Sequence, residues 1–189
     1  MAAIEPKIVM LKNSKKACIR NRTTEDSEKV LKCVLEIFQD DRFFLTTLEE
    51  IREKATIENA NERTESFNSH DYKLLLIAEV DGQIVSLSDV ECGEKKRNQH
   101  VAQIGISILP EYRGNGLGAA IIQAMIDWAT AHPVIEKLAL GVWAHNAPAI
   151  ALYEKMGFTE EGRKVKEIKY ADGSYDDCIC MYRFVEQGV

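Results

Sequence analysis

Apolar positions recur along the chain at two spacings, which separate expected helices from expected strands. Recurrence at three and four residues predicts helices, whereas alternation and short apolar runs predict strands. Helical spacing covers four segments: one after the N-capping residues 23–26, a charge-rich one at about 47–65, one that begins near 117, and 147–156. Strand spacing covers seven segments: 19–22, 73–80, 84–91, 101–109, 136–142, 164–170 and 175–182.

This pattern also sets the expected organisation. Asp81-Gly82 is a strong hairpin signal, and the run 101–109 is apolar enough on both faces to be a central strand. Residues 1–16 are predicted to be a flexible N-terminal arm. The remainder, 17–189, is predicted to be a single α/β (α+β) domain, because no linker, repeat or low-complexity tract interrupts it.

Composition narrows the class of protein. Of the 189 residues, 46% are hydrophobic and 29% are charged, which is ordinary for a globular domain with a full core. The formal net charge of −6 argues against a nucleic-acid partner, because such proteins usually carry a basic face. The same charge favours cationic substrates such as amines at long range.

The cysteines indicate whether a metal site is expected, and the N-terminal segment indicates the expected cellular location. The five cysteines include no C-x-x-C pair, so we expect reduced core residues and no metal site. The apolar patch at 8–11 is too short for a signal peptide or a membrane span. We therefore expect a cytoplasmic protein without a membrane partner.

Candidate chemistry concentrates where the central strand ends. Residues 106–119 run from an apolar strand through Pro110 and a glycine-rich loop into a helix. Gly114, Gly116 and Gly118 remove side chains where backbone N–H groups can converge, and the helix adds unpaired donors and the positive end of its dipole. The loop therefore predicts a phosphate-bearing ligand.

Two common phosphate loops can be tested by their spacing. A Walker loop is excluded because no lysine follows these glycines. The dinucleotide form G-x-G-x-x-G/A is satisfied by Gly114, Gly116 and Ala119. It also requires an acidic residue about 20 positions later at the far end of a strand. The nearest, Glu136, begins the next apolar run instead, so this alternative is weakened but stays open.

Two blocks together resemble the GNAT superfamily of N-acetyltransferases. Arg113-x-x-Gly116-x-Gly118 is similar to the family's loop for the pyrophosphate of acetyl-coenzyme A, Arg/Gln-x-x-Gly-x-Gly/Ala. Residues 146–158 are similar to the family's Asn-x-x-Ala-x-x-x-Tyr-x-x-x-Gly-Phe helix. The tail, 170–181, resembles the branch that contains ribosomal-protein N-terminal acetyltransferases and relatives that act on amino acids or small amines.

This resemblance implies both a fold and an activity. The fold would be a mixed, mostly antiparallel central sheet of about seven strands, splayed at the central strand and flanked by about four helices. Acetyl-coenzyme A (acetyl-CoA) would be the co-substrate, without a metal. Its acetyl group would pass by direct attack in a ternary complex to the primary amine of a small amine, an amino acid or a peptide N-terminus. A homodimer is a further expected partner.

The resemblance also assigns residues to the cofactor. The loop would cradle the pyrophosphate, the end of the central strand would meet the pantetheine arm through its main chain, and one side chain of the second block would add a contact. The loop residues are Arg113, Gly114, Asn115, Gly116, Leu117, Gly118 and Ala119. The strand residues are Ile106, Ser107 and Ile108, and the side chain of the second block is Asn146. Two other interpretations stay open: Arg113 as a solvated residue, and Asn146 as a helix N-cap.

Tyr153 is the candidate general acid. A phenol with a pKa near 10 stays protonated at neutral pH and can donate its proton to a leaving thiolate. The matching position has that role in many GNAT members. A core aromatic residue on the inner face of a short helix is the alternative interpretation.

The general base has no counterpart in the family pattern. Ribosomal-protein alanine acetyltransferases carry a glutamate five residues before the motif asparagine, where this chain has Gly141. The central strand offers only the neutral Gln103. We therefore take Glu91, on the preceding strand, as the candidate base. Asp89 and His100 are further candidates, and each of the three also fits an ordinary structural or surface role.

Two hypotheses about function follow. The first is an acetyl-CoA-dependent N-acetyltransferase. The alternative is a non-catalytic GNAT domain that binds coenzyme A as a sensor or assembly module. The presence of Asn146 and Tyr153 favours catalysis, whereas the missing carboxylate at 141 keeps the alternative open.

Overall fold

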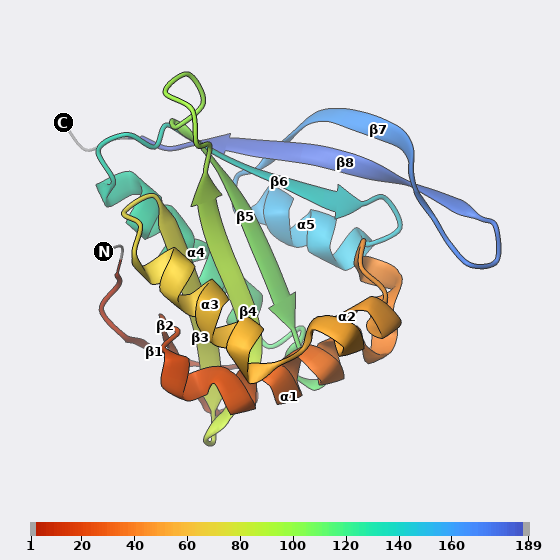
Figure 1. Cartoon of the computed structure of the whole chain (residues 1–189). Helices are drawn as coiled ribbons and strands as arrows, with labels where there is room; N and C mark the ends of the chain where they lie inside the picture. The colour runs from red at the N-terminus through yellow and green to blue at the C-terminus, as the bar shows by residue number, and fades with distance from the viewer. Residues whose placement is uncertain (1–2, 187–189) are drawn as a thin grey trace. The chain divides into compact units, whose positions relative to one another are not determined.

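The computed structural model describes residues 3–186 and contains eight strands and five α-helices within that range (Figure 1). The strands are β1 (Lys7–Met10), β2 (Lys16–Asn21), β3 (Lys73–Val80), β4 (Gln83–Cys92), β5 (Val101–Ile108), β6 (Lys137–Trp143), β7 (Thr159–Lys169) and β8 (Tyr175–Phe184). The helices are α1 (Ser27–Ile37), α2 (Leu48–Lys54), α3 (Ile57–Asn68), α4 (Leu117–Ala131) and α5 (Ala147–Lys155). Short 3-10 turns lie at Thr24–Asp26, Phe38–Phe43 and Pro110–Tyr112.

The predicted fold class is confirmed, with one more strand than the pattern indicated. The extra strand, β1, comes from the expected flexible arm and pairs antiparallel with β2, from Lys7↔Ile19 to Met10↔Lys16. The arm prediction is therefore wrong for residues 7–10 and for residue 16, while residues 1–2 lie outside the described range. The strand escaped prediction because it buries no residue fully, as in an edge strand.

The structure also has one more helix than expected. The segment 47–65 divides into α2 and α3 because each half has its own N-cap. Thr47 Oγ1 accepts a hydrogen bond from the N–H of Glu50 at 3.3 Å, and Thr56 Oγ1 accepts one from the N–H of Asn59 at 3.2 Å. The break between α2 and α3 was not predicted because this segment is rich in charge and has few apolar positions.

The sheet has the order β1-β2-β3-β4-β5-β6-β8-β7. The described registers are antiparallel except for β5 and β6, which run parallel from Val101↔Lys137 to Gln103↔Ala139. This register ends at Gln103, where the expected splay would begin. The splay itself stays a prediction.

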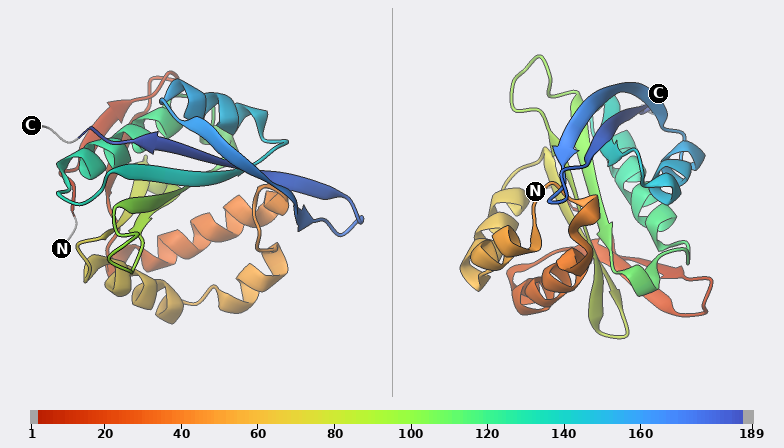
Figure 2. Two further views of the ribbon diagram at one scale, coloured as in Figure 1. Left: turned by 90° about the horizontal axis from the view of Figure 1, so that it is seen from above. Right: turned by 90° about the vertical axis from the view of Figure 1, so that its right-hand side faces the viewer.

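Contacts between Cα atoms divide the chain into two compact units. Among the described residues, the first comprises 3–91 and 105–124, and the second comprises 92–104 and 125–186. In the first unit α3 packs against α1 and against β3 (Figure 1). In the second unit β7 and β8 form a long twisted hairpin (Figure 2). The expectation of a single domain stays a prediction.

Asp26 anchors the start of α1 in the first unit. Its carboxylate oxygens accept hydrogen bonds from both terminal nitrogens of Arg20, at 2.8 and 2.7 Å, and Oδ2 also accepts one from the N–H of Thr23 at 2.8 Å. Burial acts to raise the pKa of Asp26, but these hydrogen bonds outweigh it and hold the pKa below its usual range.

Asp26→Asn is expected to lower the free energy of unfolding by about 2 kcal/mol at neutral pH, because charge-assisted hydrogen bonds are lost. The folded-state pKa is depressed, so this stabilisation is present above the unfolded pKa and is lost as pH falls through the folded one. Urea denaturation at neutral pH and near pH 3 measures both values. Asp81→Asn, in an exposed pair with Lys15, is the control and should change little. An Asp26→Asn effect that is equal at both pH values would contradict the ionic explanation.

Candidate active site

The turn between β5 and α4 has an open backbone. Gly114 and Gly116 have φ values of 71° and 90°, in the left-handed region, and a Cβ at either would meet no atom within 4 Å. The N–H of Ala120 bonds to the carbonyl of Gly116 at 3.2 Å, so the helical N–H groups ahead of it have no intrahelical partner. Open space, free donors and the positive end of a helix dipole fit an anion such as a pyrophosphate.

Arg113 is held at the start of this turn. Its Nε donates a hydrogen bond to the carbonyl of Ile108 at 2.9 Å, and its guanidinium carbon lies 5.8 Å from the ring centre of Phe43. Asn115 Nδ2 donates to the carbonyl of Arg113 at 3.2 Å, and the carbonyl of Asn115 accepts from the N–H of Lys12 at 3.1 Å. Arg113 therefore helps to fix the loop through its Nε. Within the described part of the chain its terminal nitrogens form no hydrogen bond, and their contact with a phosphate stays a prediction.

The end of β5, predicted to meet the pantetheine arm, is half-buried from Ile106 to Ile108. Ser86 Oγ donates a hydrogen bond to the carbonyl of Ser107 at 2.8 Å. The carbonyls of Ser107 and Ile108 are thus each engaged by one side chain.

The two carboxylates of β4 lie in different settings. Glu91, the predicted base, forms an ion pair with Lys73, its cross-strand neighbour on β3. Asp89 Oδ1 instead accepts a hydrogen bond from Arg63 Nη2 at 3.3 Å. A Cβ added to Gly105 would lie 3.2 Å from that same oxygen. The Asp89 carboxylate therefore covers β5 at the residue just before the predicted pantetheine contacts.

The electrostatic setting of Asp89 favours proton acceptance. Burial raises the pKa of Asp89; Arg63 opposes this rise, and Glu91 adds to it. A carboxylate with a raised pKa is a stronger base than an ordinary surface aspartate.

In the second unit, both motif residues lie on or next to α5. Asn146 Oδ1 accepts a hydrogen bond from the N–H of Ala149 at 3.3 Å, which confirms the N-cap interpretation. The Tyr153 side chain is buried, and its ring meets that of Phe158 edge-on at a centroid distance of 5.9 Å. Burial raises the pKa of Tyr153 to about 12, so the phenol keeps its proton at neutral pH.

Gly141 lies on β6 opposite β8 in the same unit. A Cβ there would approach Cys178 Sγ to 2.9 Å, so any larger residue requires the cysteine to move.

Sequence reasoning missed two groups because their contacts join distant segments. The first is Arg63, which no motif marks. The second is His145, whose Nδ1 forms a hydrogen bond with Asp176 Oδ2 and lies 3.5 Å from the hydroxyl of Tyr170. Of these residues only Tyr170 is one of the side chains that define the tail motif.

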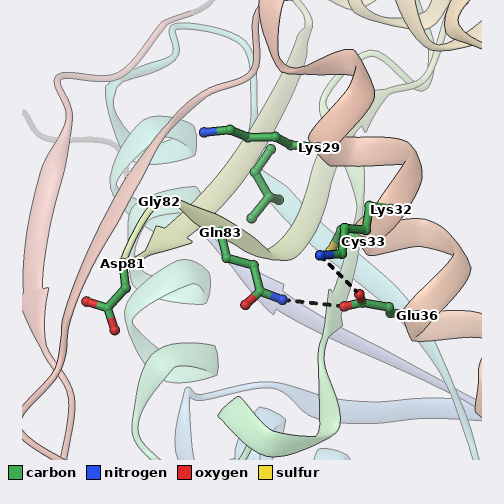
Figure 3. Close-up of a pocket in the computed structure, with 8 residues that line it drawn as sticks. Lys29, Lys32, Cys33, Glu36, Asp81, Gly82 and Gln83 are labelled. Atoms are coloured by element: carbon green, nitrogen blue, oxygen red, sulfur yellow. Dashed lines mark hydrogen bonds and ion pairs between the residues drawn. The ribbon is translucent and has the colours of Figure 1, made fainter.

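The described residues also contain a pocket of about 220 Å³ in the first unit (Figure 3). It is lined by α1 and by the hairpin between β3 and β4, where Gln83 Nε2 donates a hydrogen bond to Glu36 Oε2 at 3.4 Å. Burial raises the pKa of the Cys33 thiol in its wall to about 12, so the thiol stays protonated. No predicted site residue lines this pocket.

Three further observations concern metals, cysteines and membranes. All five cysteines are free; three of them are buried, whereas Cys18 and Cys180 are half-buried and so depart from the expected core position. Within residues 3–186, leaving aside the side chains of residues 40 and 41, no three metal-ligating side chains gather at one point. No helix in that range is both long and apolar enough to cross a bilayer. The cytoplasmic location and the homodimer stay predictions.

Comparison with known proteins assigns the chain to a family. The model of the acetyltransferase (GNAT) family matches residues 32–158, which is more than half of the chain. The chain belongs to the GNAT acetyltransferase family. The match includes residues 113–118, whose role as the pyrophosphate loop stays a prediction.

Relatives within the GNAT family differ in their acceptors. The L-amino acid N-acetyltransferase AaaT of Escherichia coli (strain K12) is 32% identical over 108 residues, which cover 57% of this chain and 66% of that protein. The spermidine N(1)-acetyltransferase of Vibrio cholerae is 30% identical over 129 residues, 66% of this chain and 73% of that protein. The match with the first relative therefore spans just under two thirds of its length.

A solved structure confirms the GNAT fold. The GNAT-family acetyltransferase from Streptococcus pneumoniae superposes with a TM-score of 0.84 at 25% identity, covering 89% of this chain and 99% of that one.

Proposed function

We propose that this GNAT protein is an acetyl-CoA-dependent N-acetyltransferase that acts on a primary amine by direct attack in a ternary complex. The observation that carries the proposal is the open turn at Gly114 and Gly116 before α4, in a chain of this family. Bound acetyl-CoA would supply an activated thioester. Residues 113–119 would hold its pyrophosphate, the main chain of 106–108 would meet the pantetheine arm, and Asn146 would add a contact while it caps α5.

The chain itself must move two protons. An ammonium group has to lose a proton before its nitrogen can attack, and the departing thiolate has to gain one. Tyr153 would give its hydroxyl proton to the thiolate. For the first transfer we propose Asp89 ahead of Glu91. Each carboxylate has a cationic partner, Arg63 for Asp89 and Lys73 for Glu91, but only Asp89 is placed over β5.

Asp89→Asn is expected to lower kcat/KM near neutral pH by roughly 10²-fold, because the proton acceptor is removed. Alkaline pH should partly restore the rate, since the free amine is then already available. Glu91→Gln is the matched comparison and should have the smaller effect. Rate profiles across pH measure both variants. A larger, alkali-rescued loss in Glu91→Gln would return the role to Glu91.

One assay separates catalysis from the alternative, a sensor or assembly module that only binds coenzyme A. The protein is incubated with acetyl-CoA and a panel of primary amines, and free thiol is followed over time. We expect thiol release that depends on the amine. Binding of coenzyme A without release across the panel would contradict the proposed function and favour the alternative.

A further inference from the structure

Asp89, the proposed base, lies beside Arg63. This pair indicates which chemical group the acceptor has next to its amine. The contact joins one nitrogen, Arg63 Nη2, to one oxygen, Asp89 Oδ1, at 3.3 Å. Within the described residues Asp89 Oδ2 and the other guanidinium donors of Arg63 form no hydrogen bond. Both groups can therefore take a further partner.

Packing holds the Arg63 head group near Asp89. The guanidinium carbon lies 4.6 Å from the ring centre of Phe67, one helical turn further along α3, and Phe67 itself is buried. Lys73 Nζ lies 5.4 Å from the centre of the same ring. The Arg63 side chain is half-exposed, so a ligand from solvent can reach it.

A third cation, Arg22, lies close enough to Arg63 for the two charges to interact. Arg22 continues β2 and donates its N–H to the carbonyl of Leu75, which is opposite Asp89 on β4. The Arg22 side chain is buried, and its Nε has no hydrogen-bond partner among the described residues. Burial lowers the pKa of Arg22 to about 10, and the charge of Arg63 adds to the decrease, yet the group stays charged at neutral pH.

Opposite charges balance at the proposed base. Arg63 pairs with Asp89 and Lys73 pairs with Glu91, while Asp26 favours the charge of the buried Arg22. An acceptor that brought only a cation would upset this balance, whereas one with an adjacent anion would keep it.

We propose that the cluster formed by Arg63, Phe67, Lys73, Asp89 and Glu91 binds the acceptor as a zwitterionic α-amino acid. This inference rests on the proposed function. The α-ammonium group binds Asp89 and the α-carboxylate binds Arg63, so the zwitterion replaces the contact between these two side chains. Charge-assisted hydrogen bonds from a guanidinium to a carboxylate are among the strongest in proteins.

The same geometry disfavours the other acceptor classes. A polyamine places a second ammonium group where Arg63 repels it, and a peptide N-terminus offers only a neutral carbonyl at that point. The relatives are named for amino-acid and for spermidine acetylation, so in this chain Arg63 is the residue that selects the amino acid.

The test uses the full chain and a panel of neutral L-amino acids, each paired with its own amide, together with spermidine. In the wild type we expect kcat/KM for the best amino acid to exceed that for its amide by at least tenfold, about 1.4 kcal/mol. Arg63→Gln should raise KM for the amino acid by roughly tenfold and reduce this preference. Arg63→Lys, which keeps the charge, should restore part of it.

Arg97→Gln, in the exposed turn that joins β4 to β5, is the control and should leave the preference unchanged. Equal rates with acid and amide in the wild type, or preference for spermidine, would overturn the inference while acetyl transfer itself stands. A preference that survives Arg63→Gln would also overturn it. Absence of thiol release with every acceptor would instead refute the proposed function.

Discussion

Gly116→Glu is expected to weaken acetyl-CoA binding by more than tenfold, over about 1.4 kcal/mol, while the chain stays folded. A Cβ at this position meets no atom within 4 Å, so the new side chain starts in open space and projects toward the site proposed for the pyrophosphate. Its carboxylate then repels the phosphates. Calorimetric titration measures the affinity.

Gly173→Glu is the matched control for this variant. Gly173 has a φ of 84°, close to the 90° of Gly116, and a Cβ there also meets no atom within 4 Å, but it lies in the turn between β7 and β8. Both variants therefore carry similar backbone strain, and only Gly116→Glu should lose affinity. Unchanged affinity in a folded Gly116→Glu protein would reject the phosphate loop. Tight binding of a nicotinamide dinucleotide would restore the dinucleotide alternative.

Tyr153→Phe is expected to lower kcat by roughly 10²-fold or more, because the hydroxyl proton for the thiolate is lost. The affinity for acetyl-CoA should barely change, since the ring and its edge contact with Phe158 are kept. With a pKa of about 12 the phenol stays protonated throughout the neutral range, so the loss should be independent of pH there.

Tyr175→Phe, at an exposed position on β8, controls for the loss of a hydroxyl and should leave kcat unchanged. Single-turnover kinetics together with a binding titration separate chemistry from affinity. A folded Tyr153→Phe protein with the kcat of the wild type would leave Tyr153 as a core aromatic residue only.

The fold could be predicted where local sequence chemistry decides the element. Helix α5 was predicted within one residue because Asn146 caps it, Pro148 lies in its first turn and Gly157 follows its last. The hairpin at Asp81-Gly82 was predicted for a similar local reason. Strand β1 was missed because its pairing with β2, and not its own apolar pattern, makes it a strand.

In the candidate site, too, features set by local sequence could be predicted, whereas contacts between distant segments could not. The phosphate loop depends on glycine spacing within one short segment, so the sequence shows it directly. The contact between Arg63 and Asp89 joins α3 to β4 across 26 positions, and no spacing rule connects them. The pairing of Glu91 with Lys73 depends on strand register, which the hydrophobic pattern indicates only approximately.

The most direct test of the proposed activity measures both products in one reaction. The protein is mixed with acetyl-CoA and the best amine of the panel, free coenzyme A thiol is titrated, and the acetylated amine is quantified by mass spectrometry. We predict equal amounts of thiol and acetylated amine, with both rates lowered together by Tyr153→Phe. Thiol release without acetylated amine, or binding of acetyl-CoA without either product, would contradict the conclusion that the chain is an N-acetyltransferase.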